Sequence, residues 1–143
     1  MTDRQLLLKA ATTAQLTGRV VEDRLTTIAL PAFLLAVLTH VRDHAPVSPS
    51  ALSIASGAPP TTLRDNIQRL VDRGLAERRP NPDDGRSYLL VLTPCGEATA
   101  AAAGAALADA YTELERRLPR PRAEYERMLE ELNGAMQEMV GPG

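Results

Sequence analysis

The chain contains a single cysteine, Cys95, among its 143 residues. One cysteine excludes an intrachain disulfide and a zinc site built on cysteine pairs. The sequence also lacks a signal peptide and any uncharged apolar run of about 18 residues, which a membrane-spanning helix requires. We therefore expect a cytoplasmic protein with no membrane partner. Its length and its apolar content of 44% predict one globular domain, residues 1–143.

Residue types that carry catalysis are also scarce. The chain has two histidines, and it has neither a glycine-rich phosphate loop nor a motif of paired carboxylates. We therefore expect no enzymatic activity and no cofactor.

Charge is nearly balanced overall but unevenly distributed. The net charge of −2 argues against a nucleic-acid partner, because phosphate binding needs local positive potential. However, six arginines face five acidic residues between positions 64 and 86, whereas nine acidic residues face five arginines from position 97 onward. The middle of the chain is therefore locally basic. Fifteen of the 16 basic residues are arginine, which suits bidentate recognition of phosphates or bases and is equally explained by a GC-rich genome.

Apolar periodicity predicts a mainly α-helical fold with one small β-hairpin. One or two helices precede Pro31, and further helices are expected at residues 32–44, 51–56, 60–73, 94–118 and 122–139. Ser48 or Ser50 can cap the short helix, which Gly57 ends. Between residues 75 and 92 the apolar period changes to alternation around a turn rich in proline, aspartate and glycine, which indicates a hairpin with a charged tip.

The predicted helix 60–73 has two different faces. Leu63, Ile67 and Leu70 fall in one apolar arc, and polar side chains occupy the opposite side. One face is therefore expected to pack against the core, and the other is free to recognise a partner.

A short helix, a turn, a second helix and a hairpin in this order form a winged helix-turn-helix. The sequence Pro-Ser-Ala-Leu at 49–52, Val-Asp-Arg-Gly-Leu at 71–75, Asp-Gly-Arg at 84–86 and Leu-Thr-Pro at 92–94 resembles the MarR family of bacterial transcriptional regulators. The resemblance implies a winged helix-turn-helix at residues 30–93, flanked by N- and C-terminal dimerisation helices at residues 1–29 and 94–143. It also implies a homodimer that binds double-stranded DNA at a palindromic operator as a ligand-responsive repressor.

The resemblance assigns roles to two residues at the tip of the hairpin, which is called the wing. It implies that Arg86 inserts towards the minor groove, where a narrow groove focuses negative potential. It also implies that Asp84 holds the wing in shape. The alternative for this pair is an exposed charge pair on a β-turn, which contributes at most about 1 kcal/mol.

The predicted reading helix departs from the family pattern at several positions. Pro59 replaces a capping serine, Asp65 a basic residue, Asn66 a leucine, and Ser56 an apolar residue. Asp65 repels phosphate but can accept a hydrogen bond from a cytosine amino group. The residues expected to contact DNA from this helix are Thr61, Thr62, Asp65, Gln68 and Arg69, with Arg64 at the edge.

His40 and His44 lie one helical turn apart, a spacing at which two imidazoles can share a metal ion. No complete third or fourth ligand is identifiable, so no metal site is predicted. The two histidines are instead assigned to contact with a small-molecule effector, with two ordinary surface histidines as the alternative. Cys95 lies in the first turn of a predicted helix, where a lowered pKa would suit a redox sensor and a small structural residue is the simpler interpretation.

Three amphipathic segments, at residues 6–28, 107–118 and 125–139, present more apolar surface than one small core covers. This excess independently predicts a homodimer. The alternative function, favoured by the net acidity and by Asp65 and Asp72, is a winged-helix module for protein–protein contact without specific DNA binding.

Overall fold

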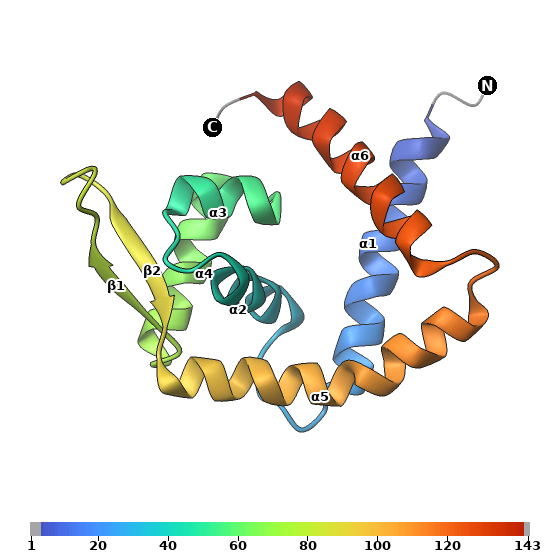
Figure 1. Cartoon of the computed structure of the whole chain (residues 1–143), viewed down its shortest axis with the longest axis horizontal. Helices are drawn as coiled ribbons and strands as arrows, with labels where there is room; N and C mark the ends of the chain where they lie inside the picture. Colours follow the sequence, from blue (N-terminus) through green and yellow to red (C-terminus); the bar gives the residue numbers. More distant parts are fainter. Residues whose placement is uncertain (1–3, 142–143) are drawn as a thin grey trace.

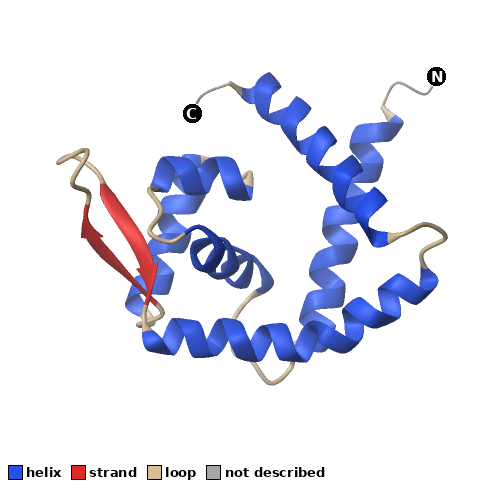
Figure 2. Ribbon diagram, in the orientation of Figure 1, coloured by secondary structure: helices blue, strands red, loops and turns tan. Residues whose placement is uncertain are grey.

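The structure, a computed structural model, describes residues 4–141, so the outer ends of the predicted domain lie outside it. The described residues form helices joined by short loops, with one two-stranded hairpin (Figure 2). The elements are α1 (Gln5–Arg24), α2 (Ala32–His44), α3 (Pro49–Ser56), α4 (Pro60–Asp72), β1 (Ala76–Pro80), β2 (Tyr88–Leu92), α5 (Pro94–Arg117) and α6 (Arg122–Val140). The predicted fold class, a mainly helical winged helix-turn-helix with one hairpin, is confirmed.

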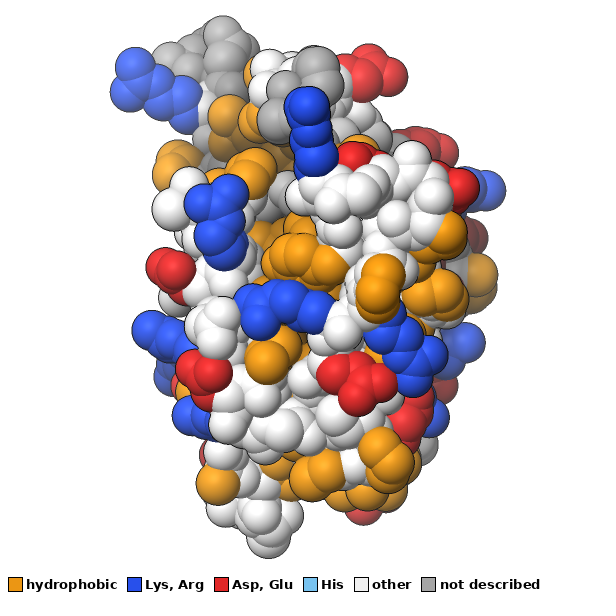
Figure 3. Space-filling view, turned by 90° about the vertical axis from the view of Figure 1, so that its left-hand side faces the viewer, with side chains coloured by type: hydrophobic (Ala, Val, Ile, Leu, Met, Phe, Trp, Pro, Cys, Tyr) orange, Lys and Arg blue, Asp and Glu red, His pale blue; other side chains and the backbone are white. Residues whose placement is uncertain are grey.

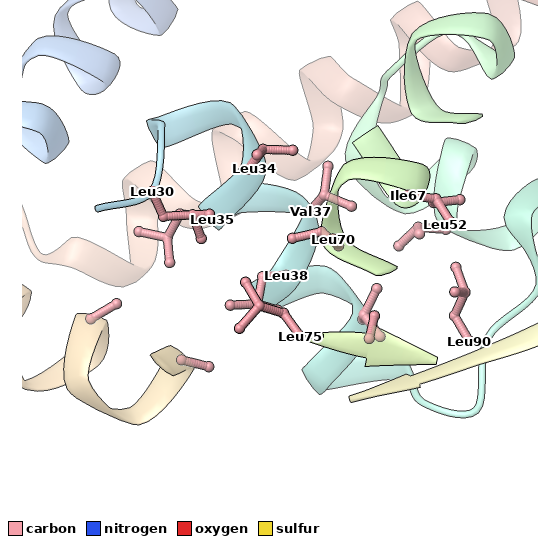
Figure 4. Close-up of a cluster of buried hydrophobic side chains, with 14 of the residues drawn as sticks. Leu30, Leu34, Leu35, Val37, Leu38, Leu52, Ile67, Leu70, Leu75 and Leu90 are labelled. Carbon is pink, nitrogen blue, oxygen red and sulfur yellow. The ribbon is translucent and has the colours of Figure 1, made fainter. Parts of the chain in front are cut away.

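The hydrophobic core surrounds α2, which contacts α3, α4, α5 and β2. Leucine dominates this cluster, as the close-up in Figure 4 shows. Burying each of these side chains stabilises the fold by about 1.5–3 kcal/mol relative to leaving it exposed. The most deeply buried members are Leu34, Leu38, Val41, Leu52, Leu63, Ile67, Leu70 and Leu90.

The ends of the short helices follow local signals. The Ser48 hydroxyl accepts a hydrogen bond from the Ala51 N–H at 3.2 Å, so α3 begins at Pro49, two residues earlier than predicted. Gly57 ends α3 in the left-handed conformation with φ 72°, which favours glycine. By contrast, Pro59 leaves α4 without a side-chain cap.

The hairpin is attached to the helices by backbone hydrogen bonds. Strands β1 and β2 pair antiparallel, with Ala76 opposite Leu92. Leu90 also exchanges two backbone hydrogen bonds with Val47 in the loop between α2 and α3. These bonds fix the hairpin beside the helix-turn-helix, where it projects from one end of the molecule (Figure 1).

The N-terminal segment forms one helix, which ends at Arg24, followed by a loop to Pro31. The prediction left one or two helices open. Leu25 and Leu30 from the loop enter the core, whereas α1 itself buries no residue. The apolar residues near position 28 therefore belong to the loop and not to the stripe of α1.

Helix α5 runs from the base of the hairpin to the opposite end of the molecule, where α1 and α6 lie (Figure 1). Helix α6, like α1, buries no residue. In the part of the chain that the structure describes, no helix is long and apolar enough to cross a membrane.

Candidate nucleic-acid interface

The two faces of α4 are separated as the periodicity predicted. Leu63, Ile67 and Leu70 are buried, and Asn66 is buried with them at 6% exposure. Asn66 therefore lies on the packing face, which gives a physical reason why leucine suits this position. The exposed residues of the helix include all of the predicted contact residues: Thr61, Thr62, Arg64, Asp65, Gln68 and Arg69.

Two of these six side chains have partners within the chain. The Arg69 guanidinium carbon lies 5.8 Å from the centre of the Phe33 ring on α2. The Gln68 amide contacts both Asp72 and Arg78. Among residues 4–141, the other four make no side-chain hydrogen bond or ion pair, so their side chains are available to a partner.

The wing tip is shaped by Asp84. Its carboxylate accepts a hydrogen bond from the backbone N–H of Arg86 at 3.0 Å, and its carbonyl accepts one from the Ser87 N–H at 3.1 Å. Within the described residues, Asp84 and Arg86 form no ion pair, so the alternative of an exposed charge pair is not what the structure shows. The Arg86 side chain is exposed and, in the same residues, has no acidic partner.

The strands of the wing contribute residues that the sequence reasoning did not single out. The Arg78 guanidinium carbon lies 5.1 Å from the centre of the Tyr88 ring on β2, and the same side chain reaches Gln68 on α4. The neighbouring Arg79 instead pairs with Glu77 at 2.9 Å. The alternation of side chains along β1 predicts that Arg78 and Arg79 point to opposite faces of the hairpin. It does not predict the contact of Arg78 with α4.

Figure 3 shows the end of the molecule that carries the hairpin. Lysine and arginine side chains are spread over this face, and acidic side chains lie among them. On α4 and the wing, Arg64 and Arg86 are exposed and have no acidic partner among residues 4–141, so they are available to phosphates.

Comparison with known proteins identifies this arrangement. A family model described as the MarR family matches residues 35–87, which include α3, α4 and the wing tip. A mutant of MarR from E. coli, solved in complex with operator DNA, matches 89% of this chain and 92% of its own length with a TM-score of 0.77 and 27% identity. Residues 35–87 thus resemble the MarR family, and most of the chain shares the fold of E. coli MarR.

Two further relatives show how far the likeness extends. The transcriptional repressor NicR of Pseudomonas putida is 33% identical over 69 residues, which are 48% of this chain and 44% of NicR. The chain thus matches less than half the length of this curated relative. BpsR of Bordetella bronchiseptica, whose DNA binding is regulated by 6-hydroxynicotinic acid, covers 90% of this chain at a TM-score of 0.76 and 23% identity, which shows the shared fold alone.

The match to the MarR family agrees with the expectation of a regulator rather than an enzyme. Cys95, the single thiol, is exposed at the second position of α5. In residues 4–141, no three histidine, cysteine or acidic side chains are grouped as a metal site would require.

The two histidines lie near the end of α2. Burial lowers the pKa of His40 and His44 adds to the effect, while Asp43 opposes it. The His44 ring contacts the His40 carbonyl at 2.9 Å through Nδ1. Neither histidine lines the cavity between α3 and α6 or the cavity between the loop after α1 and α5, so contact with an effector stays a prediction.

Two surface cavities lie beside the helix-turn-helix. The larger cavity has a volume of about 430 Å³. It lies between the end of α3, including Ile54, and residues of α6 such as Met136. The smaller, about 250 Å³, lies between the loop after α1, Arg73 at the end of α4, and Thr99 on α5.

Proposed function

We propose that this chain is a MarR-family transcriptional repressor that binds DNA in a sequence-specific way. The observation that carries the proposal is the pairing of an exposed polar helix face with a projecting wing. Helix α4 would enter the major groove with Thr61, Thr62, Arg64, Asp65, Gln68 and Arg69. Arg86 would reach the adjacent minor groove, and Asp84 would keep the wing tip in shape.

The repressor would act as a homodimer. Helices α1 and α6 bury no residue within the chain, and α5 leaves Tyr111 and Leu114 more than half exposed. So much exposed apolar surface is unusual for a monomer and fits an interface with a second copy. The exposed apolar side chains of these helices include Leu6, Leu7, Leu8, Leu16, Val20, Tyr111, Leu114, Met128, Leu129, Met139 and Val140.

A two-fold dimer presents two copies of α4, so its operator would be a palindrome with half-sites about one helical turn apart. NicR is described as a repressor, which supports this sign of regulation. A small effector would release the DNA if it bound a conformation in which the two α4 helices no longer match the half-sites. His40 and His44 remain the predicted effector contacts, and action on chromosomal DNA would place the protein in the cytoplasm.

The proposal is tested by selecting bound fragments from random DNA and then measuring affinity at several salt concentrations. We expect a palindromic sequence to be enriched, and its affinity to fall steeply with salt because each neutralised phosphate releases counterions. A protein-interaction module would enrich no sequence. That result would reject the proposed function.

A further inference from the structure

We propose that Gln68 is a specificity-determining residue whose amide is held in one orientation by Arg78 and Asp72, which act as positioning residues for base recognition. The inference rests on the proposed function, because it concerns how α4 reads the operator. It adds a pair of residues that need not touch a base themselves.

The Gln68 amide lies between a cation and an anion. A guanidinium N–H of Arg78 donates to Gln68 Oε1 at 2.8 Å, and Gln68 Nε2 donates to Asp72 Oδ1 at 2.7 Å. A guanidinium can only donate, and a carboxylate can only accept. Turning the amide by 180° would place its NH₂ group against the guanidinium and its oxygen against the carboxylate. Both contacts would then be repulsive, so the chemistry of the two partners fixes the orientation.

The Arg78 side chain is itself held in place by contacts within the wing. Arg78 pairs with Leu90 across the hairpin, so Tyr88 is its diagonal neighbour on β2. The half-buried Tyr88 ring lies 5.1 Å from the guanidinium carbon of Arg78. A cation–π contact of this kind restricts the conformations that the Arg78 side chain can adopt. The wing therefore places Arg78 against α4, whereas Asp72 belongs to α4 itself and lies one helical turn after Gln68.

The held amide retains hydrogen-bonding capacity towards DNA. After these contacts, Oε1 has one further lone pair and Nε2 has one further N–H. A glutamine amide recognises adenine by donating to N7 and accepting from N6. An unrestrained glutamine can exchange its donor and acceptor ends by flipping, whereas the amide held by Arg78 and Asp72 cannot. Its preference for one base pair should therefore be sharper.

The experiment measures base preference at every operator position by competition mobility shift, using full-length protein and an operator selected with the wild type. The Gln68→Ala variant first identifies the operator position that Gln68 recognises, because the base preference is lost at that position. We expect the wild type to prefer one base pair there by about 5- to 150-fold, the range of a bidentate contact. Arg78→Met and Asp72→Ala should each reduce this preference at least about threefold, and leave preferences elsewhere unchanged.

Arg79→Met is the matched control, because it removes the same charge from the next residue of β1, where Arg79 contacts Glu77 and not Gln68. This variant should lower affinity equally for all operator variants and keep the base preference. Arg78→Lys keeps a charged donor and should restore part of the preference. If Asp72→Ala does not fold, Asp72→Asn removes the charge that opposes the flip and should relax the preference instead.

Unchanged base preference in the Arg78 and Asp72 variants would overturn the inference. So would a uniform loss of affinity like that of Arg79→Met, because Arg78 would then be a phosphate contact. In both cases the wild type still selects an operator, so the proposed function stands. If the wild type selects no sequence, the proposed function itself fails.

Discussion

Gly96, in the first turn of α5, packs directly against the backbone carbonyl of Leu75 at the start of the hairpin. A Cβ atom at position 96 would overlap the Leu75 carbonyl oxygen. The Thr93 N–H donates to the same oxygen at 3.1 Å, and the Thr93 hydroxyl caps α5 by accepting from the Gly96 N–H at 3.0 Å. This close contact joins the wing to the long helix that leads to the proposed dimer interface.

Gly96→Ala should therefore destabilise the protein. The added methyl group meets backbone, which cannot rotate away, so a loss of about 1–3 kcal/mol in the free energy of unfolding is expected. Gly104→Ala is the matched control, because the same helix leaves open space around position 104. There alanine should stabilise by about 0.5–1 kcal/mol through its better helix propensity. Urea unfolding of both variants measures the difference, and equal stability would contradict the contact.

A second link joins α1 to α5 through Glu113. Its carboxylate accepts hydrogen bonds from Arg117 at 2.6 Å and from Arg24 at 2.8 Å. These arginines lower the pKa of Glu113 to about 2, and the hydrogen bond from Arg117 makes the largest contribution. Because the folded pKa is depressed, the stabilisation is complete above the unfolded pKa of 4.5 and is lost as pH falls towards 2.

Glu113→Gln should consequently lower the melting temperature at pH 7, and the difference from wild type should shrink between about pH 4.5 and 2. Thermal unfolding followed by circular dichroism across this range measures the effect. Glu130→Gln removes an exposed carboxylate that has no ion pair within the described residues, and should show no such trend. A difference that is constant with pH would exclude the ionised carboxylate as its cause.

The proposed dimer interface is tested by Leu114→Glu. Leu114 is 54% exposed in the single chain, so the substitution should leave the fold of the protomer intact. In a dimer it would bury an unpaired charge in an apolar contact, which is costly. Light scattering should therefore show a monomer with weakened DNA binding, whereas Arg116→Ala on the same helix should remain dimeric. A Leu114→Glu variant that is still fully dimeric would exclude this part of α5 from the interface.

The elements were predictable from sequence because their signals are local. Proline and glycine mark the helix ends, and the apolar period separates the faces of α4. The contact of Gln68 with Arg78 was not predictable, because it depends on how the hairpin is docked beside α4 through Val47 and Leu90. Asn66 stands where the family pattern has leucine, but only the packing shows that this polar residue is buried.

Asp84→Ala separates wing shape from wing charge. The Asp84 carboxylate holds the Arg86 N–H, so its loss should loosen the wing tip and lower DNA affinity. Because no phosphate or groove contact is removed, the slope of affinity against salt should stay as in wild type. A mobility shift at several salt concentrations measures both quantities. A flattened slope would show instead that Asp84 organises charge contacts with the DNA.

The central claim is that the wing and α4 together bind DNA, and Arg86→Ala tests it most directly. On a selected operator, at two salt concentrations, we expect affinity to fall by about 1–3 kcal/mol in each half-site and the salt dependence to flatten. Melting temperature and dimer size should not change, because Arg86 is exposed and has no acidic partner in residues 4–141. Arg86→Lys should recover only part of the loss, because it keeps the charge without the planar guanidinium. Equal affinity of Arg86→Ala and wild type at both salt concentrations would remove the wing from the mechanism and favour a protein-interaction module.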